Sequence, residues 1–272
     1  MNGRVVARAL GILPISVRRA VIGSVDNPSW FANFAHKLLN RLPVNRDEAF
    51  DCQGDLEGFR MCTEWKRYRG LVYGSWEPEV SAIVKKSVQK GMTALDVGGH
   101  IGYYTLLLAR LVGPDGRVFS FEPSPDNFEF LEKNVRINAL AHVSLSHMAL
   151  FSRAGTFTMT IPDAATNSGG ASIVHTVGSA SIAIETMTLD SFCEGNAAQP
   201  AFVKMDVEGA EYDVLIGGEK TIRTNRPKML IELHHFDGNI GGHPVPELLK
   251  SWGYEVEWIE RFPQTSHIFA AG

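Results

Sequence analysis

The chain has 272 residues, of which 44% are hydrophobic and 21% charged, and its formal net charge is −4. Such a composition is that of a folded protein with a real core, and the length suits one large α/β domain, alone or with an appendage. The slightly acidic charge excludes a general attraction to nucleic acid, so no nucleic-acid partner is expected. No apolar stretch is long enough to span a bilayer, and Arg4, Arg8 and Pro14 interrupt what could have been a signal core, which predicts a cytoplasmic protein.

The cysteines also favour a cytoplasmic protein. Cys52, Cys62 and Cys193 are odd in number and far apart, with no Cys-x-x-Cys pair and no zinc-type spacing. Free thiols in a reducing compartment are therefore expected rather than disulfides or a structural zinc site.

The first 70 residues differ in character from the rest of the chain. Residues 1–46 carry seven basic side chains against the single acidic residue Asp26. Their apolar residues recur at spacings typical of short amphipathic helices. We predict an N-terminal helical arm or lid over 1–70 that packs on a main domain at 71–272. Weak contact of this basic arm with a membrane surface, and closure over a substrate, are the alternatives.

Strand and helix patterns alternate from residue 92 onward. Apolar or alternating β-rich runs predict strands at 93–98, 117–123, 143–150, 201–207, 228–234, 254–260 and 266–271. Helical spacing predicts helices at 101–111, 124–138, 210–222 and 243–253. This alternation is typical of βαβ units and predicts an α/β fold with a mostly parallel sheet and helices on both faces. Residues 155–190 interrupt this strand–helix alternation and are predicted to be an inserted β-hairpin or edge strands.

The stretch LDVGGHIGYYT, residues 95–105, follows the first of these strands and opens a helix. Glycines there allow a tight turn and close approach of a ligand, at the strand ends where α/β sheets bind ligands. A dinucleotide site would need Gly-x-Gly-x-x-Gly, whereas Gly98, Gly99 and Gly102 are spaced differently. Asp96 at the strand end would repel a diphosphate and suits a cationic ligand.

An acidic residue also ends the next strand. Glu122 lies 20 residues after Gly102, a separation that suits a carboxylate binding ribose hydroxyls. An aminonucleoside with a cationic end would satisfy both Asp96 and Glu122, and S-adenosylmethionine (SAM) is such a ligand. A nicotinamide-dependent oxidoreductase is the alternative, and the glycine spacing disfavours it.

Several segments together resemble the FkbM family of SAM-dependent methyltransferases. In chain order they are GLVYGSWEPEV, LDVGGHIGYYTLLLARLVGPDGRVFSFEPSPDNFEFLEKNV, MALFSRAG, TLDSF, FVKMDVEGAEYDVL and MLIELH, from about residue 70 to 235. The set is specific because Phe-Glu-Pro and Asp-Val-Glu-Gly-Ala-Glu occur together at the expected separation. The resemblance implies a class I methyltransferase (Rossmann-like) fold with a seven-stranded sheet and one antiparallel strand near the C-terminus. One departure is His100, where the family's glycine loop usually has Asn.

The resemblance also implies SAM as donor, S-adenosylhomocysteine as product and often a hydroxyl as acceptor. The acceptor would be a small molecule, namely a sugar, a polyketide or a lipid-linked glycan, and a homodimer is compatible with the sequence. The alternatives are a nitrogen, protein or nucleic-acid acceptor and a non-catalytic binding protein. Residues 1–70 and 155–190 are expected to shape the acceptor pocket. The predicted cofactor-binding residues are Tyr73, Glu77, Asp96, Gly98, His100, Gly102, Tyr103, Glu122, Pro123, Ser124, Ala149 and Asp206.

Four carboxylates surround one glycine in KMDVEGAEYD, residues 204–213. In the implied fold they follow the fourth parallel strand, beside the first. Asp206 at the strand tip is predicted to act in catalysis, with Lys204 on the same face as its partner. Glu208 and Glu211 are predicted to be a capping pair for the next helix, because acids favour its positive end.

The next strand ends in IELHH, which places Glu232 and His234 on one face. Both arrive beside Asp206 if the two strands are neighbours. Two roles stay open for Asp206, Glu232 and His234. One is a His234 base steered by an acid and active above about pH 6.5, and the other is a divalent metal site of Asp206, Glu232 and His234. The metal-free base is favoured, because the sequence contains no dedicated metal-binding motif.

Overall fold

The computed structural model describes residues 48–64, 68, 70–72, 76–161, 172–174, 180–235 and 242–272. Its elements in chain order are β1 (Ala49–Asp51), η1 (Gly54–Leu56), β2 (Arg60–Cys62), α5 (Pro78–Ser87), β3 (Thr93–Val97), α6 (Tyr103–Val112), β4 (Arg117–Phe121), α7 (Pro125–Ile137), β5 (Val143–Ser146), β6 (Ala149–Leu150), β7 (Gly155–Ile161), β8 (Ala180–Met187), α8 (Leu189–Gly195), β9 (Phe202–Met205), α9 (Glu211–Gly217), α10 (Glu219–Asn225), β10 (Lys228–His234), α11 (Pro244–Ser251), β11 (Glu255–Arg261) and β12 (Thr265–Ala271).

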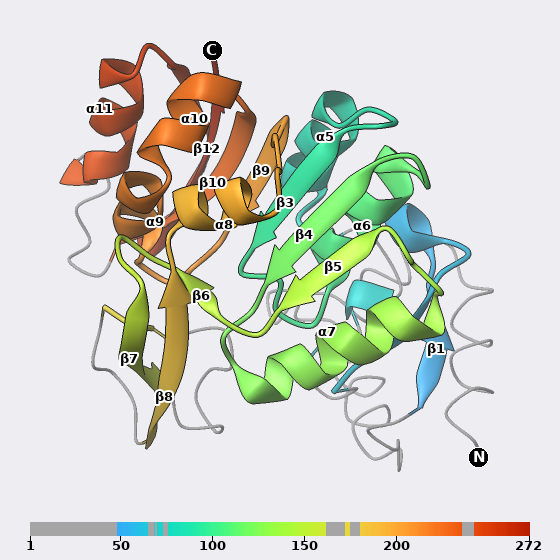
Figure 1. Ribbon diagram of the computed structural model, residues 1–272. Helices are drawn as coiled ribbons and strands as arrows, with labels where there is room; N and C mark the ends of the chain where they lie inside the picture. The colour runs from blue at the N-terminus through green and yellow to red at the C-terminus, as the bar shows by residue number, and fades with distance from the viewer. Residues whose placement is uncertain are drawn as a thin grey trace.

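A seven-stranded sheet in the order β11-β12-β10-β9-β3-β4-β5 forms the centre of the fold. The five strands from β10 to β5 pair in parallel, whereas β12 is antiparallel to both of its neighbours. Helices α8, α9, α10 and α11 cover one face of the sheet, and α5 and α6 cover the other (Figure 1). This arrangement confirms the predicted α/β class I methyltransferase fold, including its antiparallel strand near the C-terminus.

The inner strands are apolar on both sides because helices cover both faces of the parallel sheet. Phe202 and Leu230 belong to the core under α5 and α6, whereas Val203 and Ile231 belong to the core under the other helices. Burial of each such apolar side chain stabilises the fold by about 1.5–3 kcal/mol relative to leaving it exposed. Lys204 is a charged residue within this apolar run and is only 2% exposed, so its position needs a local partner.

The segment predicted as one helix at 210–222 forms two helices, α9 and α10, separated at Gly218. A Cβ on Gly217 would lie 2.2 Å from the carbonyl oxygen of Phe151, and one on Gly218 would lie 2.6 Å from the side chain of Leu189. Glycine permits both close approaches. The helical pattern could not predict the break, because the two contacting residues are distant in sequence.

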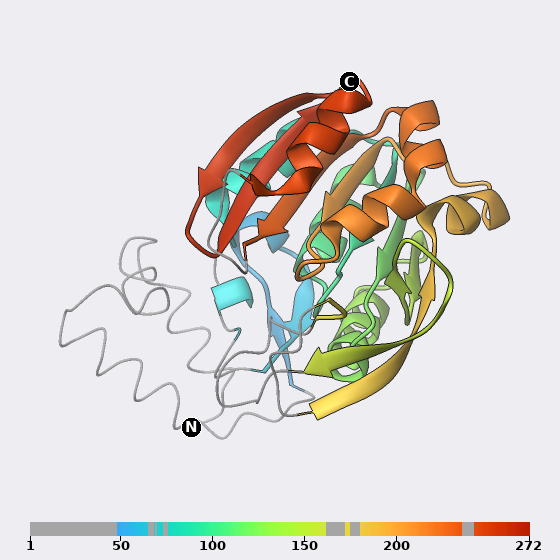
Figure 2. The same cartoon turned by 90° about the vertical axis from the view of Figure 1, so that its left-hand side faces the viewer.

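The segment predicted as one strand at 143–150 also divides. Strand β5 forms the edge of the large sheet, whereas β6 pairs with β8 in a separate three-stranded sheet of order β6-β8-β7. Strands β7 and β8 pair antiparallel within residues 155–190, the stretch that interrupts the strand–helix alternation. In Figure 2 the yellow β8 lies well apart from the red β11 and β12 of the large sheet.

Residues 49–62 form a β-hairpin with one short 3-10 helix, not the amphipathic α-helix predicted for the arm. Strands β1 and β2 form an antiparallel pair around η1, and Phe50 is buried in the main core. The side chain of Asn134 on α7 accepts the N–H of Cys62 and donates to its carbonyl. The hairpin thus depends on a helix that is distant in sequence. Residues 1–47, with most of the basic side chains of the predicted arm, lie outside the described residues.

The three cysteines are free, as predicted, and the structure buries all three. Burial raises the pKa of Cys193 to about 11 and that of Cys52 to about 12, so neither thiol is reactive at neutral pH. Among the described residues, no helix is both long enough and apolar enough to cross a membrane.

The tips of β3 and β9 touch at Gly98. Its φ is 90°, and a Cβ there would lie 1.7 Å from the carbonyl oxygen of Asp206. Gly98→Ala should therefore force the two strand tips apart. The free energy of unfolding should fall by about 3 kcal/mol, at the upper end of the usual range for overpacking, and urea unfolding would measure it.

Gly91→Ala is the matched control for that variant. Gly91 also has a positive φ of 81°, but no heavy atom lies within 4 Å of a Cβ placed there. Only the strain of a left-handed backbone, about 1–2 kcal/mol, is expected. Equal losses in the two variants would mean that contact between the strand tips does not require glycine at position 98.

Candidate functional site

A cavity of about 420 Å³ lies at the carboxyl ends of β3, β4, β9 and β10. Its volume is within the usual range for small-molecule sites, about 300–1,000 Å³. The walls come from the loop at residues 98–102, here called the glycine loop, from the strand tips, and from the chain before α5. The residues of the predicted sites that line it are Glu77, Gly98, His100, Tyr103, Glu122, Pro123, Ala149, Lys204, Asp206 and Glu232.

Other predicted residues do not form the cavity wall. Gly102 is the N-cap of α6 with φ 100°, and Ser124 is the N-cap of α7. Asp96 and His234 also lie behind the lining residues, each held by a neighbouring side chain. Tyr73 lies outside the described residues.

Asp96 lies in the core beneath the glycine loop. Its Oδ2 accepts a 2.5 Å hydrogen bond from Thr105, whose hydroxyl lies 2.9 Å from that of Ser120. Burial raises the pKa of Asp96 to about 6. The carboxyl group connects β3 to the first turn of α6, and this placement favours a structural role over direct contact with a cationic ligand.

Glu122 faces the cavity from the end of β4. Its Oε2 accepts the N–H of His100 at 2.8 Å, and its Oε1 accepts the N–H of Ser124 at 2.9 Å. Burial raises the pKa of this carboxyl to about 7, although the hydrogen bonds act in the opposite direction. The two backbone bonds fix the group in place, and the carboxylate keeps acceptor capacity for a ligand hydroxyl.

His100 has a left-handed backbone with φ 48°. Asn and His are among the side chains enriched in this conformation, which explains why His can replace the usual Asn of the loop. Its Nε2 lies 3.2 Å from the hydroxyl oxygen of Tyr68, and both residues line the cavity. The ring is thus held against the wall by the segment that precedes the core.

The buried Lys204 and the partly exposed Asp206 form an ion pair at the tip of β9, as predicted. The Nζ of Lys204 lies 3.0 Å from Oδ2 of Asp206 and 4.9 Å from the centre of the Tyr104 ring. Burial opposes both charges, but their attraction keeps the pKa of Lys204 above and that of Asp206 below the ordinary value. Both groups are therefore ionised at neutral pH.

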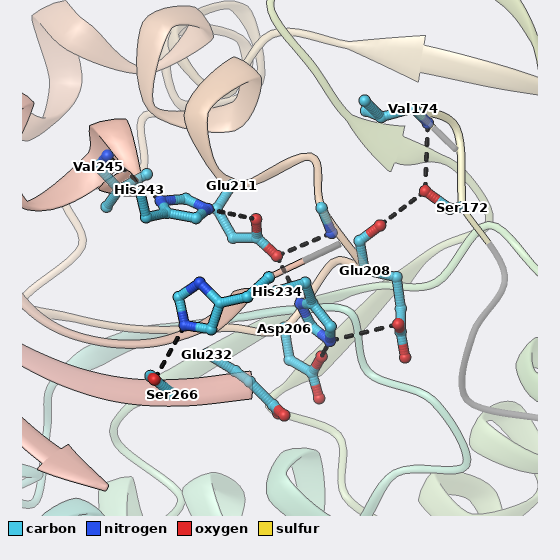
Figure 3. A network of polar contacts seen from close by, with 12 residues as sticks. Ser172, Val174, Asp206, Glu208, Glu211, Glu232, His234, His243, Val245 and Ser266 are labelled. Atoms are coloured by element: carbon cyan, nitrogen blue, oxygen red, sulfur yellow. Dashed lines mark hydrogen bonds and ion pairs between the residues drawn. The ribbon is translucent and has the colours of Figure 1, made fainter. Parts of the chain in front are cut away.

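His234 at the end of β10 is held by Glu211 (Figure 3), not by the Glu232 that shares its strand face. Its Nδ1 lies 2.7 Å from Glu211, and its Nε2 lies 3.2 Å from Glu208 and 3.9 Å from Asp206. Burial lowers the pKa of His234, but these carboxylates outweigh it and raise the value to about 10. The imidazole is therefore cationic at neutral pH, which favours a role in stabilising charge over that of a base.

The capping pair predicted for α9 does not form. Glu211 is the first residue of α9, but its buried carboxylate accepts the N–H of Gly209 and of His234 instead of capping the helix. Glu208 has φ 51°, lines the cavity, and has its pKa raised to about 8 by burial. With Asp206, three acids of the motif converge on one histidine from another strand, which no local pattern could reveal.

Glu232 reaches the cavity from β10, and its carboxylate lies 3.5 Å from His267 on β12. Ligand atoms of Asp206, Glu232 and His234 lie within 4.8 Å of one another, so the structure does bring together the predicted metal set. A cation held there would face the ammonium of Lys204, which is 3.0 Å from Asp206. This repulsion disfavours the metal alternative.

Tyr68, Tyr104 and Asn127 line the cavity but were not predicted as site residues. The hydroxyl of Tyr104 donates to Glu77 at 2.8 Å, and the side chain of Asn127 hydrogen-bonds Glu122. Tyr104 belongs to an apolar helical run, where periodicity alone cannot separate an aromatic ring at a cavity from one in the core. No sequence signal could have selected these three residues.

The chain matches the family model described as the methyltransferase FkbM domain over residues 96–256. It is 30% identical over 159 residues to the hexuronic acid methyltransferase AglP of Haloferax volcanii, covering 58% of this chain and 62% of that protein. It is 28% identical over 198 residues to the 31-O-demethyl-FK506 methyltransferase FkbM of Streptomyces tacrolimicus, covering 62% and 75% of the two chains. A crystal structure of methyltransferase FkbM from Methylobacillus flagellatus aligns with a TM-score of 0.48 at 14% identity, over 98% of this chain and 58% of that one.

The chain thus spans about three fifths of the length of AglP. The matched region includes Asp96, Glu122, the 204–213 motif and the end of β10, which are the segments that build the cavity. The family model covers more than half of the chain, and the protein therefore belongs to the FkbM family of methyltransferase domains.

Proposed function

We propose that the protein transfers the methyl group of SAM to a hydroxyl of a small molecule. One observation carries this proposal: a single cavity is lined both by the glycine loop with Glu122 and by the acidic strand tips at Asp206 and Glu232. The first group suits a nucleoside, and the second suits a cationic centre beside an acceptor hydroxyl. The names of the two relatives, a hexuronic acid methyltransferase and a 31-O-demethyl-FK506 methyltransferase, support a sugar-like or polyketide acceptor and an oxygen atom.

The residues present fit SAM at both ends of the molecule. The fixed carboxyl of Glu122 is placed for ribose hydroxyls, and on the opposite wall, among the described residues, the carboxylates of Asp206 and Glu232 outnumber the one lysine, Lys204. When bound, SAM supplies a methyl group already activated on a positively charged sulfur. An acidic wall therefore complements the donor better than it would complement a diphosphate.

The strand tips supply the groups that handle the acceptor hydroxyl. Asp206 is held ionised by Lys204, so it accepts a hydrogen bond from the hydroxyl and orients its oxygen toward the donor. Glu232 is in the cavity wall on the neighbouring strand and takes the proton. We assign this step to Glu232 rather than to His234, because His234 is cationic and lies behind the wall.

Two measurements test this function. Calorimetry with SAM and with NAD should show binding of SAM alone, and preferential binding of NAD would contradict the proposal. Labelled SAM incubated with a metabolite extract, and separately with glucuronic acid, should give a product whose mass and fragmentation show an O-methyl group. Label found only on nitrogen, protein or nucleic acid would favour the alternative acceptors.

Glu122→Ala should weaken SAM binding by roughly 1.5–3 kcal/mol, the scale of a hydrogen bond to a charged group. This corresponds to about a 10- to 150-fold rise in Kd measured by calorimetry. Glu132→Ala on the exposed side of α7 is the matched control and should bind like the parent. Parent-like affinity in Glu122→Ala would remove the ribose assignment.

A further inference from the structure

Three titratable side chains form a row across neighbouring strands beside the cavity. Glu232 on β10 lies opposite His267 on β12, and His267 lies opposite Glu260 on β11. The Nε2 of His267 is 3.5 Å from Glu232, and its Nδ1 is 3.2 Å from Glu260. Glu232 lines the cavity, whereas Glu260 is the most exposed of the three, with 21% of its side chain accessible. The row therefore leads from the cavity toward solvent.

A β-bulge in β11 brings Glu260 into this row. Trp258 pairs with Ile268 of β12. The next pair is Glu260 with His267, so Ile259 is passed over. In a regular strand Ile259 would stand opposite His267, since side chains alternate between the two faces. Bulges re-aim side chains next to functional sites, and this one replaces an apolar contact of the imidazole by a carboxylate.

Charged groups from four elements surround the buried ring of His267. They are Glu232 on β10, Glu260 on β11, Glu77 before α5 and Lys204 on β9. Burial lowers the pKa of His267, but Glu232 and Glu77 raise it above its ordinary value, and Lys204 opposes them. With a carboxylate beside each ring nitrogen, the imidazole can release a proton on one side and accept one on the other.

We propose that Glu232, His267 and Glu260 form a proton path out of the acceptor site. The proposal rests on the proposed function, in which an oxygen–carbon bond forms and the carbon–sulfur bond breaks, with its electron pair left on sulfur. The hydroxyl proton must then leave. Glu232 takes it, His267 gives its Nδ1 proton to Glu260 and accepts the new one at Nε2, and Glu260 passes its proton to water.

A titration of the protein without any cofactor gives the first test. NMR should show the pKa of His267 falling by about one unit or more in Glu260→Gln, the scale for loss of an adjacent opposite charge. Glu232→Gln should produce a fall of similar size. Glu257→Gln is the matched control, because Glu257 is an exposed acid on the same strand that stands opposite Phe269, and it should leave the titration unchanged.

Turnover gives the second test. With labelled SAM and the metabolite extract, Glu260→Gln should lower kcat roughly tenfold, below the effect of losing a direct acid–base group. The KM and the calorimetric Kd for SAM should stay at the parent values, and Glu260→Asp should recover most of the rate. A purely structural role for Glu260 would not produce this separation of kcat from KM.

The outcomes separate the path from the proposed function. An unchanged His267 titration in Glu260→Gln overturns the path whatever the activity, and so does parent-like turnover in that variant. If the parent protein binds no SAM in calorimetry, the proposed function fails first and the path fails with it. A shifted titration, reduced kcat and unchanged SAM affinity together support the path.

Discussion

Asp206→Asn should lower methyl transfer by roughly 10²-fold or more, the scale for losing the group that orients a reacting atom. The carboxylate lines the cavity, with Oδ2 bound to Lys204 at 3.0 Å and Oδ1 facing His234 at 3.9 Å. Asparagine keeps the shape but removes the charge, and it can place an N–H where the acceptor hydroxyl needs a hydrogen-bond acceptor. The rate of label transfer from SAM would measure the loss.

Folding and cofactor affinity should survive this change. Lys204 keeps other carboxylates nearby, from Glu232, Glu77 and Asp96, so its buried charge is not left alone. The glycine loop and Glu122 are untouched, and the Kd for SAM should stay within a few-fold of the parent.

Asp213→Asn is the matched control for Asp206→Asn. It changes an acid of the same motif, but the carboxylate of Asp213 accepts a 2.6 Å hydrogen bond from Ser152 and is not in the cavity wall. Its turnover should equal that of the parent. Normal turnover in Asp206→Asn, or equal losses in both variants, would contradict a catalytic role at the strand tip.

Glu211→Gln should lower the free energy of unfolding by about 3–5 kcal/mol near pH 6, the scale for breaking a buried ion pair. If Glu211 only capped a helix, as the sequence alone predicts, this substitution would lower the free energy of unfolding by only about 0.5–2 kcal/mol. The larger value follows from the structure, because Glu211 is 0% exposed and lies 2.7 Å from Nδ1 of His234. Urea unfolding would distinguish the two values.

This loss should depend on pH in a defined way. The pKa of His234 is about 10 in the fold against 6.5 ordinarily, so its stabilisation is full below about pH 6.5 and is lost as pH rises through 10. The pKa of Glu211 is lowered from 4.5, so its contribution is present above that value and is lost in acid. The difference between parent and variant should therefore be largest between about pH 4.5 and 6.5.

Glu219→Gln is the control for that pH series. Glu219 begins α10 as Glu211 begins α9, but its side chain is 45% exposed and pairs with Arg223 on the surface. Such a pair contributes at most about 0.5 kcal/mol. A loss of this small size in Glu211→Gln, or a loss that does not vary with pH, would contradict the buried ion pair.

Local patterns in the sequence determined the strands and helices of the sheet and the place of the site. Strand–helix alternation depends on the burial period of each segment, and the glycine loop and Glu122 follow from spacing along one βαβ unit. The position of Asp206 beside β3 and of Glu232 beside β9 follows from strand order, which the family resemblance implies. All of these features are short-range, or are set by the order of elements.

Apart from the Lys204–Asp206 pair, only the tertiary structure decided which charged groups meet. The choice of Glu211 over Glu232 as partner of His234, and of His267 as partner of Glu232, depends on side chains from separate elements. The break at Gly218 and the hairpin at 49–62 also depend on distant contacts. Burying a charge costs free energy unless an opposite charge or a hydrogen-bonding group lies beside it. That cost depends on distance in space, so the partner can come from any part of the chain.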